Sequence, residues 1–198
     1  MAFTSSGRTT GRAGGTRQKT PPPPLDQPAL DALALAYVAR FATSSGRLST
    51  YLGRKLRERG WAGDSPPDVA AIVARMADRR YLDDAAYAAA KSEGLRRRGY
   101  GVRRIETALD HDGIAPALRS AVRGSETERR RAVLAFARRK RFWPYSAGPC
   151  LDPAMRAKHL AAYMRAGHGL DHVRRVMDAQ GLDELEEWAD EHAEDAVE

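Results

Sequence analysis

The chain has 198 residues, of which 33 are lysine or arginine and 26 are aspartate or glutamate, giving a formal net charge of +7 at neutral pH. Its single cysteine, Cys150, excludes an intramolecular disulfide and a multi-cysteine zinc site. No apolar run is long enough to cross a bilayer, and no apolar segment follows the N-terminal arginines as in a secretory signal, so we expect a soluble, cytoplasmic protein.

The first 28 residues form a compositionally distinct N-terminal segment. They are rich in Ser, Thr, Gly, Arg and Pro, with four consecutive prolines at 21–24. Such a segment has too little apolar surface to offset the entropy that ordering would cost. We therefore expect residues 1–28 to be a disordered basic tail.

Helical periodicity begins near Leu30 and predicts a first three-helix unit over residues 29–79. Its first helix should end at the Ser-Ser-Gly sequence at 44–46, the second should span about 48–59, and the third should follow a capping-box start at 65–68. The apolar residues expected to face inward are Leu30, Leu33, Tyr37 and Phe41, then Leu52 and Leu56, then Val69, Ile72, Val73 and Met76.

The stretch from Tyr81 to Ile114 carries the clearest pattern in the chain and predicts a helical hairpin. Asp83 can accept hydrogen bonds from the unpaired N–H groups of the first helical turn, and the Asp83 and Asp84 carboxylates favour the positive end of the helix dipole. Gly99 and Gly113 can adopt the left-handed conformation that commonly ends helices.

A helix from about residue 115 to 124 completes a second unit over residues 80–124. A capping-box sequence at 125–128 then starts a helix that runs to about Arg141, and a loop containing proline and glycine follows. We interpret residues 125–152 as a basic helix and loop that connect two units.

The loop carries two aromatic residues, Trp143 and Tyr145, beside several basic ones. Basic and aromatic side chains together could form a stacking platform for single-stranded nucleic acid. We favour the alternative that these rings cover the junction between units, because large aromatic side chains usually supply buried area.

A third unit is predicted over residues 153–190. Asp152 and Pro153 start its first helix, a Gly-His-Gly sequence turns the chain, and a last helix leads into an acidic tail at 191–198. The tail could fold over the basic surface and compete with a polyanionic partner, although a solvated terminus is the simpler interpretation. The apolar residues expected to face inward are Leu160, Tyr163 and Met164, then Leu170, Val173 and Met177, then Leu185 and Trp188.

One apolar pattern recurs in all three units. Residues at i, i+3 and i+7 share one helix face, and a glycine stop and a further apolar residue follow them. The three copies are Val102, Ile105, Leu109, Gly113 and Ile114; Leu170, Val173, Met177, Gly181 and Leu182; and, more loosely, Ser49, Leu52, Leu56, Gly60 and Trp61. The sequence therefore predicts an all-α fold, an elongated array of three tandem three-helix repeat units.

Charge is distributed unevenly along the chain. Residues 178–198 contain ten acidic residues and no lysine or arginine, so residues 1–177 carry 33 basic and 16 acidic residues, a balance of +17. A body this basic indicates a polyanionic partner, with nucleic acid the leading candidate and an acidic protein surface the second. Solubility alone is the remaining explanation.

The stretch RRYLDDAAYA, followed by RRRGYGVRRIETALDHDGI, resembles the RecX family of recombination regulators. The family's central repeat carries Tyr-Leu-Asp-Asp-x-x-aromatic-Ala, then Arg-x-Gly and Ile-x-x-x-Leu before Gly-Ile. The matching positions are Tyr81, Leu82, Asp83, Asp84, Tyr87, Ala88, Arg97, Gly99, Ile105, Leu109, Gly113 and Ile114. The resemblance extends from about Leu30 to about Trp188 and is weakest between 124 and 152. Where the family usually has glycine before the tyrosine, this chain has Arg80.

The resemblance implies a regulator that lies along the groove of a RecA filament on single- or double-stranded DNA. There it would inhibit ATP hydrolysis and strand exchange or alter filament assembly, and so act on homologous recombination, DNA repair and the SOS response. Many weak charged contacts spread along a filament can supply the affinity, so the role needs no active site, metal or cofactor, and we expect a monomer without membrane association. The expected contact residues are Arg54 and Lys55 in the first unit and Tyr81, Arg96, Arg97, Arg98, Tyr100, Arg103 and Arg104 in the second. For each arginine, a merely solvated helix face is the alternative.

Two other function classes remain open. A stand-alone DNA- or RNA-binding helical module would use the same arginines without a recombinase. Because no helix is rich in the Asn, Gln or Ser side chains that, beside arginine, read base edges, we expect such binding not to be sequence-specific. Enzyme activity is the weakest class. His168 and His172 have the i, i+4 spacing of a metal-binding pair, but His168 directly precedes Gly169 at a predicted turn, so the spacing does not indicate a metal site. Capping accounts for Asp83 and Asp84, Cys150 has no obvious histidine partner, and the chain has no phosphate-binding loop.

Overall fold

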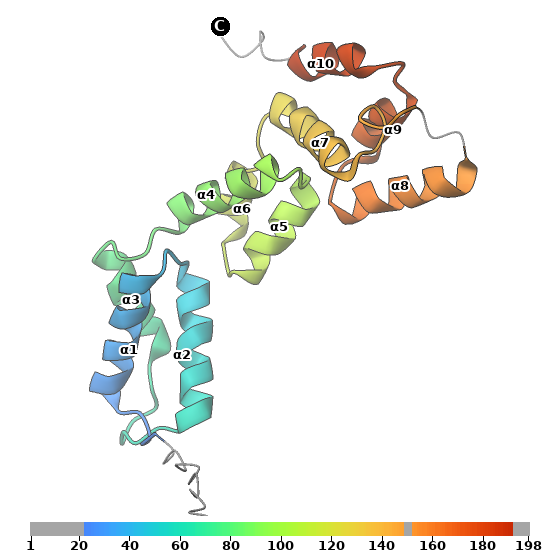
Figure 1. Ribbon diagram of the computed structural model, residues 1–198. Coiled ribbons are helices and arrows are strands. Elements are labelled where there is room, and N and C mark those ends of the chain that lie inside the picture. Colours follow the sequence, from blue (N-terminus) through green and yellow to red (C-terminus); the bar gives the residue numbers. More distant parts are fainter. Residues whose placement is uncertain (1–21, 149–151, 192–198) are drawn as a thin grey trace, which may run out of the picture.

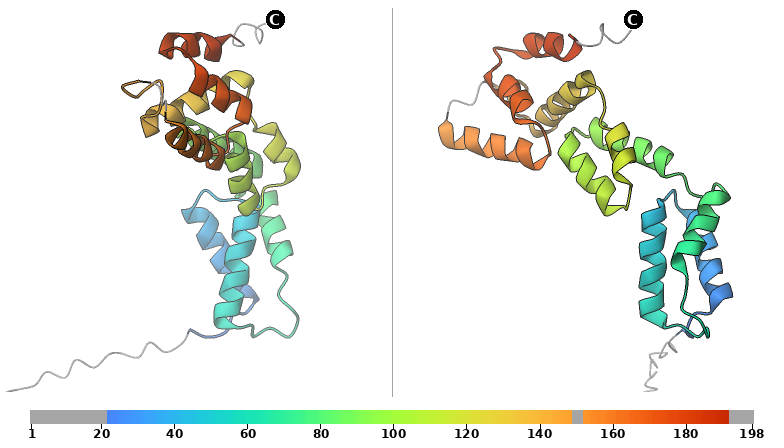
Figure 2. Two further views of the ribbon diagram at one scale, coloured as in Figure 1. Left: turned by 90° about the vertical axis from the view of Figure 1, so that its right-hand side faces the viewer. Right: turned by 180° about the vertical axis from the view of Figure 1, so that it is seen from behind.

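The computed structural model describes residues 22–148 and 152–191. Within these ranges every regular element is a helix, apart from one isolated backbone bridge between Leu25 and Trp61, so the predicted all-α class is confirmed. The helices are α1 (Gln27–Arg40), α2 (Ser45–Arg59), α3 (Val69–Asp78), α4 (Asp84–Arg97), α5 (Val102–His111), α6 (Pro116–Ala121), α7 (Glu126–Lys140), α8 (Pro153–Arg165), α9 (Leu170–Asp178) and α10 (Leu182–Asp190). They form three groups along an elongated molecule, with α1–α3 at one end and α7–α10 at the other (Figure 1; Figure 2).

Short polar side chains start most of these helices. Asp83 caps α4 as predicted, because its carboxylate accepts a hydrogen bond from the backbone N–H of Ala86 at 2.8 Å. The capping box predicted at 125–128 is complete at the start of α7. A cap of this kind contributes about 1 kcal/mol. Gly99 and Gly113, which follow α4 and α5, have the predicted left-handed backbone, with φ of 74° and 73°.

The first group packs α1, α2 and α3 around one hydrophobic cluster. Its buried residues are Leu25, Leu30, Ala34, Leu48, Leu52, Ile72, Met76 and Leu82. The burial of Leu25 corrects the predicted tail, because ordered structure begins before residue 28. The Leu25 backbone N–H donates to the Gly60 carbonyl at 2.9 Å and its carbonyl accepts from the Ala62 N–H at 2.8 Å, which ties the chain entering α1 to the end of α2. Residues 1–21 lie outside the described residues.

Two details of α1 and α2 differ from the prediction. Ser44 does not mark the end of the first helix but caps the second, since its Oγ accepts from the Arg47 N–H at 3.2 Å and α2 starts at Ser45. The Phe41 side chain, expected to face inward, is 50% exposed. The reason is that α1 ends at Arg40 and Phe41 has extended φ and ψ angles of −131° and 127°, so the helical spacing no longer applies to it.

The second group, made of α4, α5 and α6, has the smallest hydrophobic cluster. Its buried residues are Ala88, Leu95, Ile105, Leu109 and Ile114. Three of them belong to the predicted stripe that follows the Gly-Tyr-Gly turn, with Ile114 packing back after the glycine stop. So few buried side chains make this group dependent on its neighbours for stability.

The third group gathers α7 with α8, α9 and α10 rather than leaving α7 as a connector between groups. Its buried residues are Val133, Leu134, Phe136, Ala137, Tyr163, Ala166, Val173, Val176, Ala179, Leu185, Trp188 and Ala189. This placement differs from the predicted role of residues 125–152, because the apolar face of α7 supplies a large part of the cluster. We propose that α7 be counted with the third unit.

The loop after α7 covers the third cluster. The Trp143 Nε1–H donates to the Ala179 carbonyl at 2.9 Å, and Tyr145 packs partly buried against the cluster. Both rings therefore contribute to the packing of this group, in line with the interpretation that they supply buried area rather than a stacking platform for nucleic acid. In α9 the last position of the predicted apolar stripe differs by one residue: Val176 is fully buried, whereas the predicted Met177 is only partly buried.

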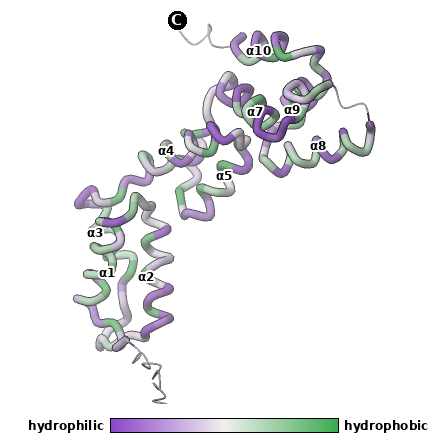
Figure 3. The backbone as a smooth tube through the Cα atoms, in the orientation of Figure 1, coloured by the Kyte–Doolittle hydropathy of each residue, from purple (hydrophilic) through white to green (hydrophobic). Residues whose placement is uncertain are grey.

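Hydrophilic and hydrophobic residues are interspersed along the helices in Figure 3. In the part of the chain that the structure describes, no helix combines the length and apolar character needed to span a membrane. The apolar side chains are instead gathered into the three clusters.

The first and second groups meet at a close backbone contact, which we call the first joint. A Cβ added to Gly46 would lie 2.6 Å from the Asp112 carbonyl oxygen, and one added to Gly113 would lie 2.7 Å from the Gly46 Cα. The Ser44 hydroxyl donates to the same Asp112 carbonyl at 2.6 Å. Only glycine leaves room for this approach.

The second and third groups meet at an equivalent contact, the second joint, where the Gly-Tyr-Gly turn after α4 packs on the Gly-His-Gly turn after α8. The Gly101 N–H donates to the Ala166 carbonyl at 2.8 Å. The His168 Nε2–H donates to the Gly99 carbonyl at 3.0 Å. A Cβ added to Gly101 would collide with the backbone of Gly167. Two glycine turns, each of which directly precedes a copy of the repeated apolar pattern, thus pack on each other.

Candidate nucleic-acid interface

The nine residues predicted to contact DNA or a protein partner lie in two places. Arg54 and Lys55 lie on α2 of the first group. The other seven extend from the turn before α4 to the first turn of α5 and are Tyr81, Arg96, Arg97, Arg98, Tyr100, Arg103 and Arg104. Of these, Arg97, Arg98, Arg103 and Arg104 are exposed, and Tyr81 is 51% exposed. Exposed cations in one stretch of surface can meet a polyanion without displacing packed structure.

Arg96 differs from its exposed neighbours, because its charge is engaged within the fold. Its side chain is only 11% exposed and pairs with Glu93 at 2.9 Å and with Glu128 at 3.0 Å. It also donates to the Val122 carbonyl at 2.9 Å. Arg96 therefore ties α4 to the end of α6 and to the first turn of α7, and its charge is already paired.

Tyr100 is likewise held within the structure. Its ring packs against both the second and the third cluster, and the Arg139 guanidinium lies 4.9 Å from the ring centroid. The ring therefore packs at the second joint and lines the recesses there, and the sequence did not reveal this because residues of α7 and α8 contribute to its surroundings.

A basic recess at the second joint combines residues that are far apart in the sequence. Arg104 of α5 lines it together with Arg139 and Lys140 at the end of α7 and Arg165 at the end of α8. The recess has a volume of about 340 Å³, and none of the described residues that line it is acidic. We call these four residues the joint patch. The run of basic residues in α7 signalled part of it, but only the packing of the two turns brings α5 beside α7 and α8.

A second recess at the same joint, of about 320 Å³, holds Arg103. Its other basic lining residues are Arg96, Arg123 and Arg129. Arg123 pairs with Glu106 at 2.6 Å and Arg129 pairs with Glu126 at 2.7 Å. Arg103 makes no ion pair within the described ranges, so it is the cation of this recess that remains available to a partner.

The C-terminal end of α10 pairs with two arginines of α7, the helix predicted to be basic. Arg131 pairs with Asp190 at 2.8 Å, and Arg130, which is only 9% exposed, pairs with Glu191 at 3.1 Å. The acidic C-terminal segment therefore neutralises two arginines of α7 where it begins. Residues 192–198 of the predicted acidic tail lie outside the described residues.

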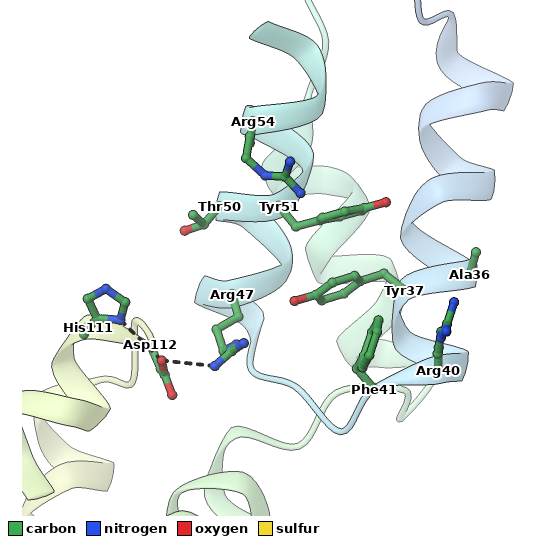
Figure 4. Close-up of a pocket in the computed structure, with 10 residues that line it drawn as sticks. All are labelled: Ala36, Tyr37, Arg40, Phe41, Arg47, Thr50, Tyr51, Arg54, His111 and Asp112. Carbon is green, nitrogen blue, oxygen red and sulfur yellow. Dashed lines mark ion pairs between the residues drawn. The ribbon is translucent and has the colours of Figure 1, made fainter. Parts of the chain in front are cut away.

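A further recess, of about 580 Å³, lies between α1, α2 and the end of α5 (Figure 4). Its lining includes three aromatic and three arginine side chains, namely Tyr37, Phe41 and Tyr51 with Arg40, Arg47 and Arg54. Of these, sequence reasoning chose only Arg54 as a contact residue. The helical stripe assigned Tyr37 and Phe41 to the core, and the exposure of Phe41 depends on the early end of α1, which the sequence did not indicate.

The residues considered for metal binding have other partners. His168 is 2% exposed and donates to a backbone carbonyl, while His172 Nε2 pairs with Glu126 at 2.7 Å. Among the described residues no group of three or more His, Cys, Asp or Glu side chains is placed to hold a metal ion. Cys150 lies outside the described residues.

The adjacent carboxylates of Asp83 and Asp84 both position α4. Asp83 caps the helix, and Asp84 Oδ1 accepts a hydrogen bond from the Ser45 backbone N–H at 2.8 Å across the first joint. The first role was predicted. The second follows from the packing of α2 against the start of α4.

Asp112 is a buried carboxylate at the first joint, only 2% exposed. Burial alone would raise the pKa of this carboxyl, but hydrogen bonds from Lys91 and from the Tyr87 hydroxyl, the latter at 2.6 Å, hold the pKa below its ordinary value. Arg47 approaches the other carboxylate oxygen at 3.5 Å. The carboxylate thus links α2, α4 and α5 through its charge.

Two ionisable groups near the second joint are shifted in the same direction. Burial opposes ionisation of Glu126, but hydrogen bonds from Arg129, His172 and Arg130 outweigh it and lower the pKa of the carboxyl to about 2. Burial lowers the pKa of His168 to about 4, although its hydrogen bond to a backbone carbonyl acts in the other direction. His168 is therefore neutral and Glu126 ionised at neutral pH.

No family model matches the chain. A curated protein of Myxococcus xanthus (strain DK1622), described as "Regulatory protein RecX", is 30% identical over 158 residues, which cover 76% of this chain and 84% of that protein. A solved structure described as "Crystal structure of regulatory protein RecX" matches with a TM-score of 0.56 and 18% identity, covering 76% of this chain and 72% of that one. The structural match concerns the fold, while the sequence match spans most of both proteins.

Proposed function

This chain belongs to the RecX family of regulatory proteins, and from that membership we propose that it regulates a RecA recombinase by binding the RecA–DNA filament. The proposed effect is inhibition or modulation of RecA ATP hydrolysis and strand exchange, and through them of homologous recombination, DNA repair and the SOS response. Regulation by binding needs no catalytic residue, and we propose a cytoplasmic monomer that acts through its surface.

The observation that carries this proposal is the joint patch, Arg104, Arg139, Lys140 and Arg165. Two successive groups of helices contribute to it, and among the described residues no acidic side chain lines the recess. A filament repeats DNA phosphates and protein surface along its length, so an elongated ligand that contacts several repeats gains affinity from many weak contacts. Exposed cations on separate groups of helices suit that geometry.

The proposed contact surface differs from the set of residues expected from the sequence, because packing determines which side chains remain accessible. It omits Arg96, whose charge is paired within the fold, and Tyr100, which lines the joint-patch recess but packs against the clusters on both sides of the joint. It adds three residues of the joint patch that come from the third group. The proposed contact residues are Arg54, Lys55, Tyr81, Arg97, Arg98, Arg103, Arg104, Arg139, Lys140 and Arg165.

The test is single-stranded-DNA-dependent ATP hydrolysis by the cognate RecA, titrated with this protein at fixed near-physiological salt. Binding of the protein to the same DNA without RecA is measured in parallel. We expect inhibition well below the concentration at which the protein coats naked DNA. The double variant Arg104→Gln/Arg165→Gln should need roughly tenfold more protein for the same inhibition, because it loses two cations of the joint patch.

The matched control is Lys158→Gln/Arg174→Gln, which removes two exposed cations that line none of the recesses described above. It should inhibit RecA nearly as well as the unchanged protein. Equal weakening by both double variants would mean that only net charge matters.

A second candidate function is a non-sequence-specific DNA- or RNA-binding module that acts without RecA. The same basic recesses favour it, because phosphate contacts alone give salt-dependent binding to naked nucleic acid. Inhibition confined to concentrations at which the DNA is already sequestered, or no inhibition at all, would select this candidate instead.

A further inference from the structure

The recess in Figure 4 spans the first joint and contributes only Arg54 to the proposed filament contacts. Helices α1 and α2 form most of its wall, and His111 and Asp112 at the end of α5 close one side. Its volume of about 580 Å³ exceeds that of either recess at the second joint. Its lining combines aromatic rings with cationic side chains, a combination that can bind a ligand with both a flat apolar part and an anionic part.

The aromatic part is a short stack with one accessible end. Tyr37 and Tyr51 stack with ring centroids 4.2 Å apart and planes inclined by 17°. Phe41 contacts the stack at an angle, with its ring centroid 5.3 Å from that of Tyr37 and the two planes inclined by 52°. The Phe41 side chain is 50% exposed, so a large apolar ring is held in contact with solvent at the mouth of the recess. A flat aromatic ligand would remove that ring surface from water.

The cationic part surrounds the stack. The Arg40 guanidinium lies 5.6 Å from the Phe41 centroid, and the Arg54 guanidinium lies 5.6 Å from the Tyr51 centroid. In Figure 4 Arg47 extends from α2 toward the end of α5. Within the described ranges Arg40 makes no ion pair, and Arg54 pairs only with the exposed Glu58 on its own helix.

Asp112, the one acidic side chain among the described residues of the lining, does not cancel these cations. Asp112 accepts hydrogen bonds from Lys91 and Tyr87 on one carboxylate oxygen, and Arg47 lies at 3.5 Å from the other. The Arg47 side chain is 48% exposed, so it can turn to a second anion without leaving Asp112 unpaired.

We propose that this recess is a binding site for single-stranded nucleic acid, in which one base stacks on Phe41 and the flanking phosphates contact Arg40, Arg47 and Arg54. Every base has a face that stacks on an aromatic ring, and arginines can contact the backbone on either side, so the site is tolerant of sequence. An acidic peptide would use the arginines but leave the exposed ring without a partner. In a duplex the bases stack on one another, so none is free for Phe41 without unstacking.

The test measures binding of the full chain, without RecA, to a labelled oligothymidylate of about 12 nucleotides, a length within the range that single-strand sites cover. A strand of the same length whose sugars lack bases carries the same phosphates. We expect the chain to prefer the strand with bases. Phe41→Leu keeps an apolar side chain but removes the aromatic face, and it should lower affinity for oligothymidylate by roughly 5- to 30-fold while leaving binding to the abasic strand unchanged.

The arginines are tested by the salt dependence of the same binding. Arg40→Gln and Arg54→Gln should each weaken binding to both strands and reduce the slope of log affinity against log salt by about 0.7, as expected when one phosphate of a single strand is no longer neutralised. Arg174→Gln, an exposed cation of α9 outside the recess, is the matched control and should leave the slope nearly unchanged. Circular dichroism checks that each variant is folded.

Equal affinity of the unchanged chain for the two strands, or an equal effect of Phe41→Leu on both, would overturn the proposal and leave the recess as a surface for an acidic partner. No binding of oligothymidylate at low salt would overturn it as well. The site does not require a recombinase, so RecA ATP hydrolysis measured with Phe41→Leu separates the two proposals. Retained inhibition together with weakened oligothymidylate binding supports the site and the filament function independently.

Discussion

Asp112 is the residue on which the first joint depends. It is buried, and it gathers Lys91, the Tyr87 hydroxyl and Arg47 around one carboxylate, while its own backbone carbonyl accepts from Ser44. Removing one partner of such a pair leaves the other charge poorly compensated, which costs more than the pair itself contributes.

We expect Asp112→Asn to lower the free energy of unfolding by about 2 kcal/mol, measured by urea denaturation, because Lys91 would lose its counter-charge. Adding Lys91→Met should restore part of the loss, since the unpaired charge is then gone. Additive losses in the double variant would show that the two side chains do not interact.

Arg80 carries backbone strain at the position where the family usually has glycine. Its φ is 59°, in the left-handed region that non-glycine residues enter at a cost. We expect Arg80→Gly to raise the free energy of unfolding by about 0.5–1 kcal/mol. The neighbouring Arg79 has a φ of −81°, so Arg79→Gly is the control and should lower the free energy of unfolding by a similar amount. A lower free energy of unfolding in both variants would contradict backbone strain at Arg80.

His168 makes the stability of the second joint depend on pH. Burial lowers its pKa in the folded chain to about 4, below the value near 6.5 of an unfolded histidine. Between these values the unfolded chain binds the extra proton, so the contribution of His168 is complete above pH 6.5 and is lost as pH falls toward 4.

The measurement is the free energy of unfolding between pH 4 and pH 7, with His168→Gln as the comparison. Glutamine can still donate to the Gly99 carbonyl but does not titrate, so the variant should lose most of the pH dependence in this window. The half-buried His159, which stacks on Phe142 with centroids 3.8 Å apart and whose pKa burial also lowers, accounts for a remaining share. An unchanged pH profile in His168→Gln would rule out the assignment.

At the scale of elements, the two joints share one device, a pair of glycines at which the backbones of successive groups touch. Gly46 meets Gly113 at the first joint, and Gly101 meets Gly167 at the second. At the second joint the Gly101 N–H also donates to the Ala166 carbonyl, and at the first joint the Ser44 hydroxyl donates to the Asp112 carbonyl. The groups cannot shift without breaking these hydrogen bonds, which sets the orientation of each group on the next.

We expect Gly101→Ala to lower the free energy of unfolding by roughly 2 kcal/mol or more, because the added methyl group would force the backbones of the second joint apart. Gly94→Ala is the control, since a Cβ there meets nothing within 4 Å and the residue lies inside α4. That change should stabilise the helix by up to about 1 kcal/mol. Equal destabilisation by Gly101→Ala and Gly94→Ala would contradict the claim that the second joint requires glycine at position 101.

At the scale of the whole molecule, each group is stabilised partly by its neighbours. Counted over the described residues, the middle cluster has five buried residues, whereas the first and third clusters have eight and twelve. A core this small cannot offset the entropy of folding by itself, so the middle group should fold only when it is joined to another.

We therefore expect a fragment of residues 80–124 to be largely unfolded by circular dichroism, whereas a fragment of residues 22–124 should fold and unfold in one transition. The second fragment restores the first joint and the cluster around Leu48 and Leu52. A folded isolated fragment 80–124 would show that the middle group is independent of its neighbours.

The sequence by itself determined the helices, because their start and stop signals are local. Asp83, the capping box at 125–128 and the glycines at 99 and 113 act on backbone groups within a few residues, and the apolar spacing identifies one face of each helix. The family motif lies in the same local stretch. These features need no knowledge of distant residues.

Tertiary structure alone decided which of the basic and aromatic residues face solvent and which meet one another. Arg96 and Tyr100 looked like their exposed neighbours, yet the carboxylate of Glu128 and the packing of α7 engage them. The joint patch and the recess around Phe41 each combine helices distant in the sequence. Such sites arise from the angle between successive groups, which close glycine contacts set and helical periodicity does not encode.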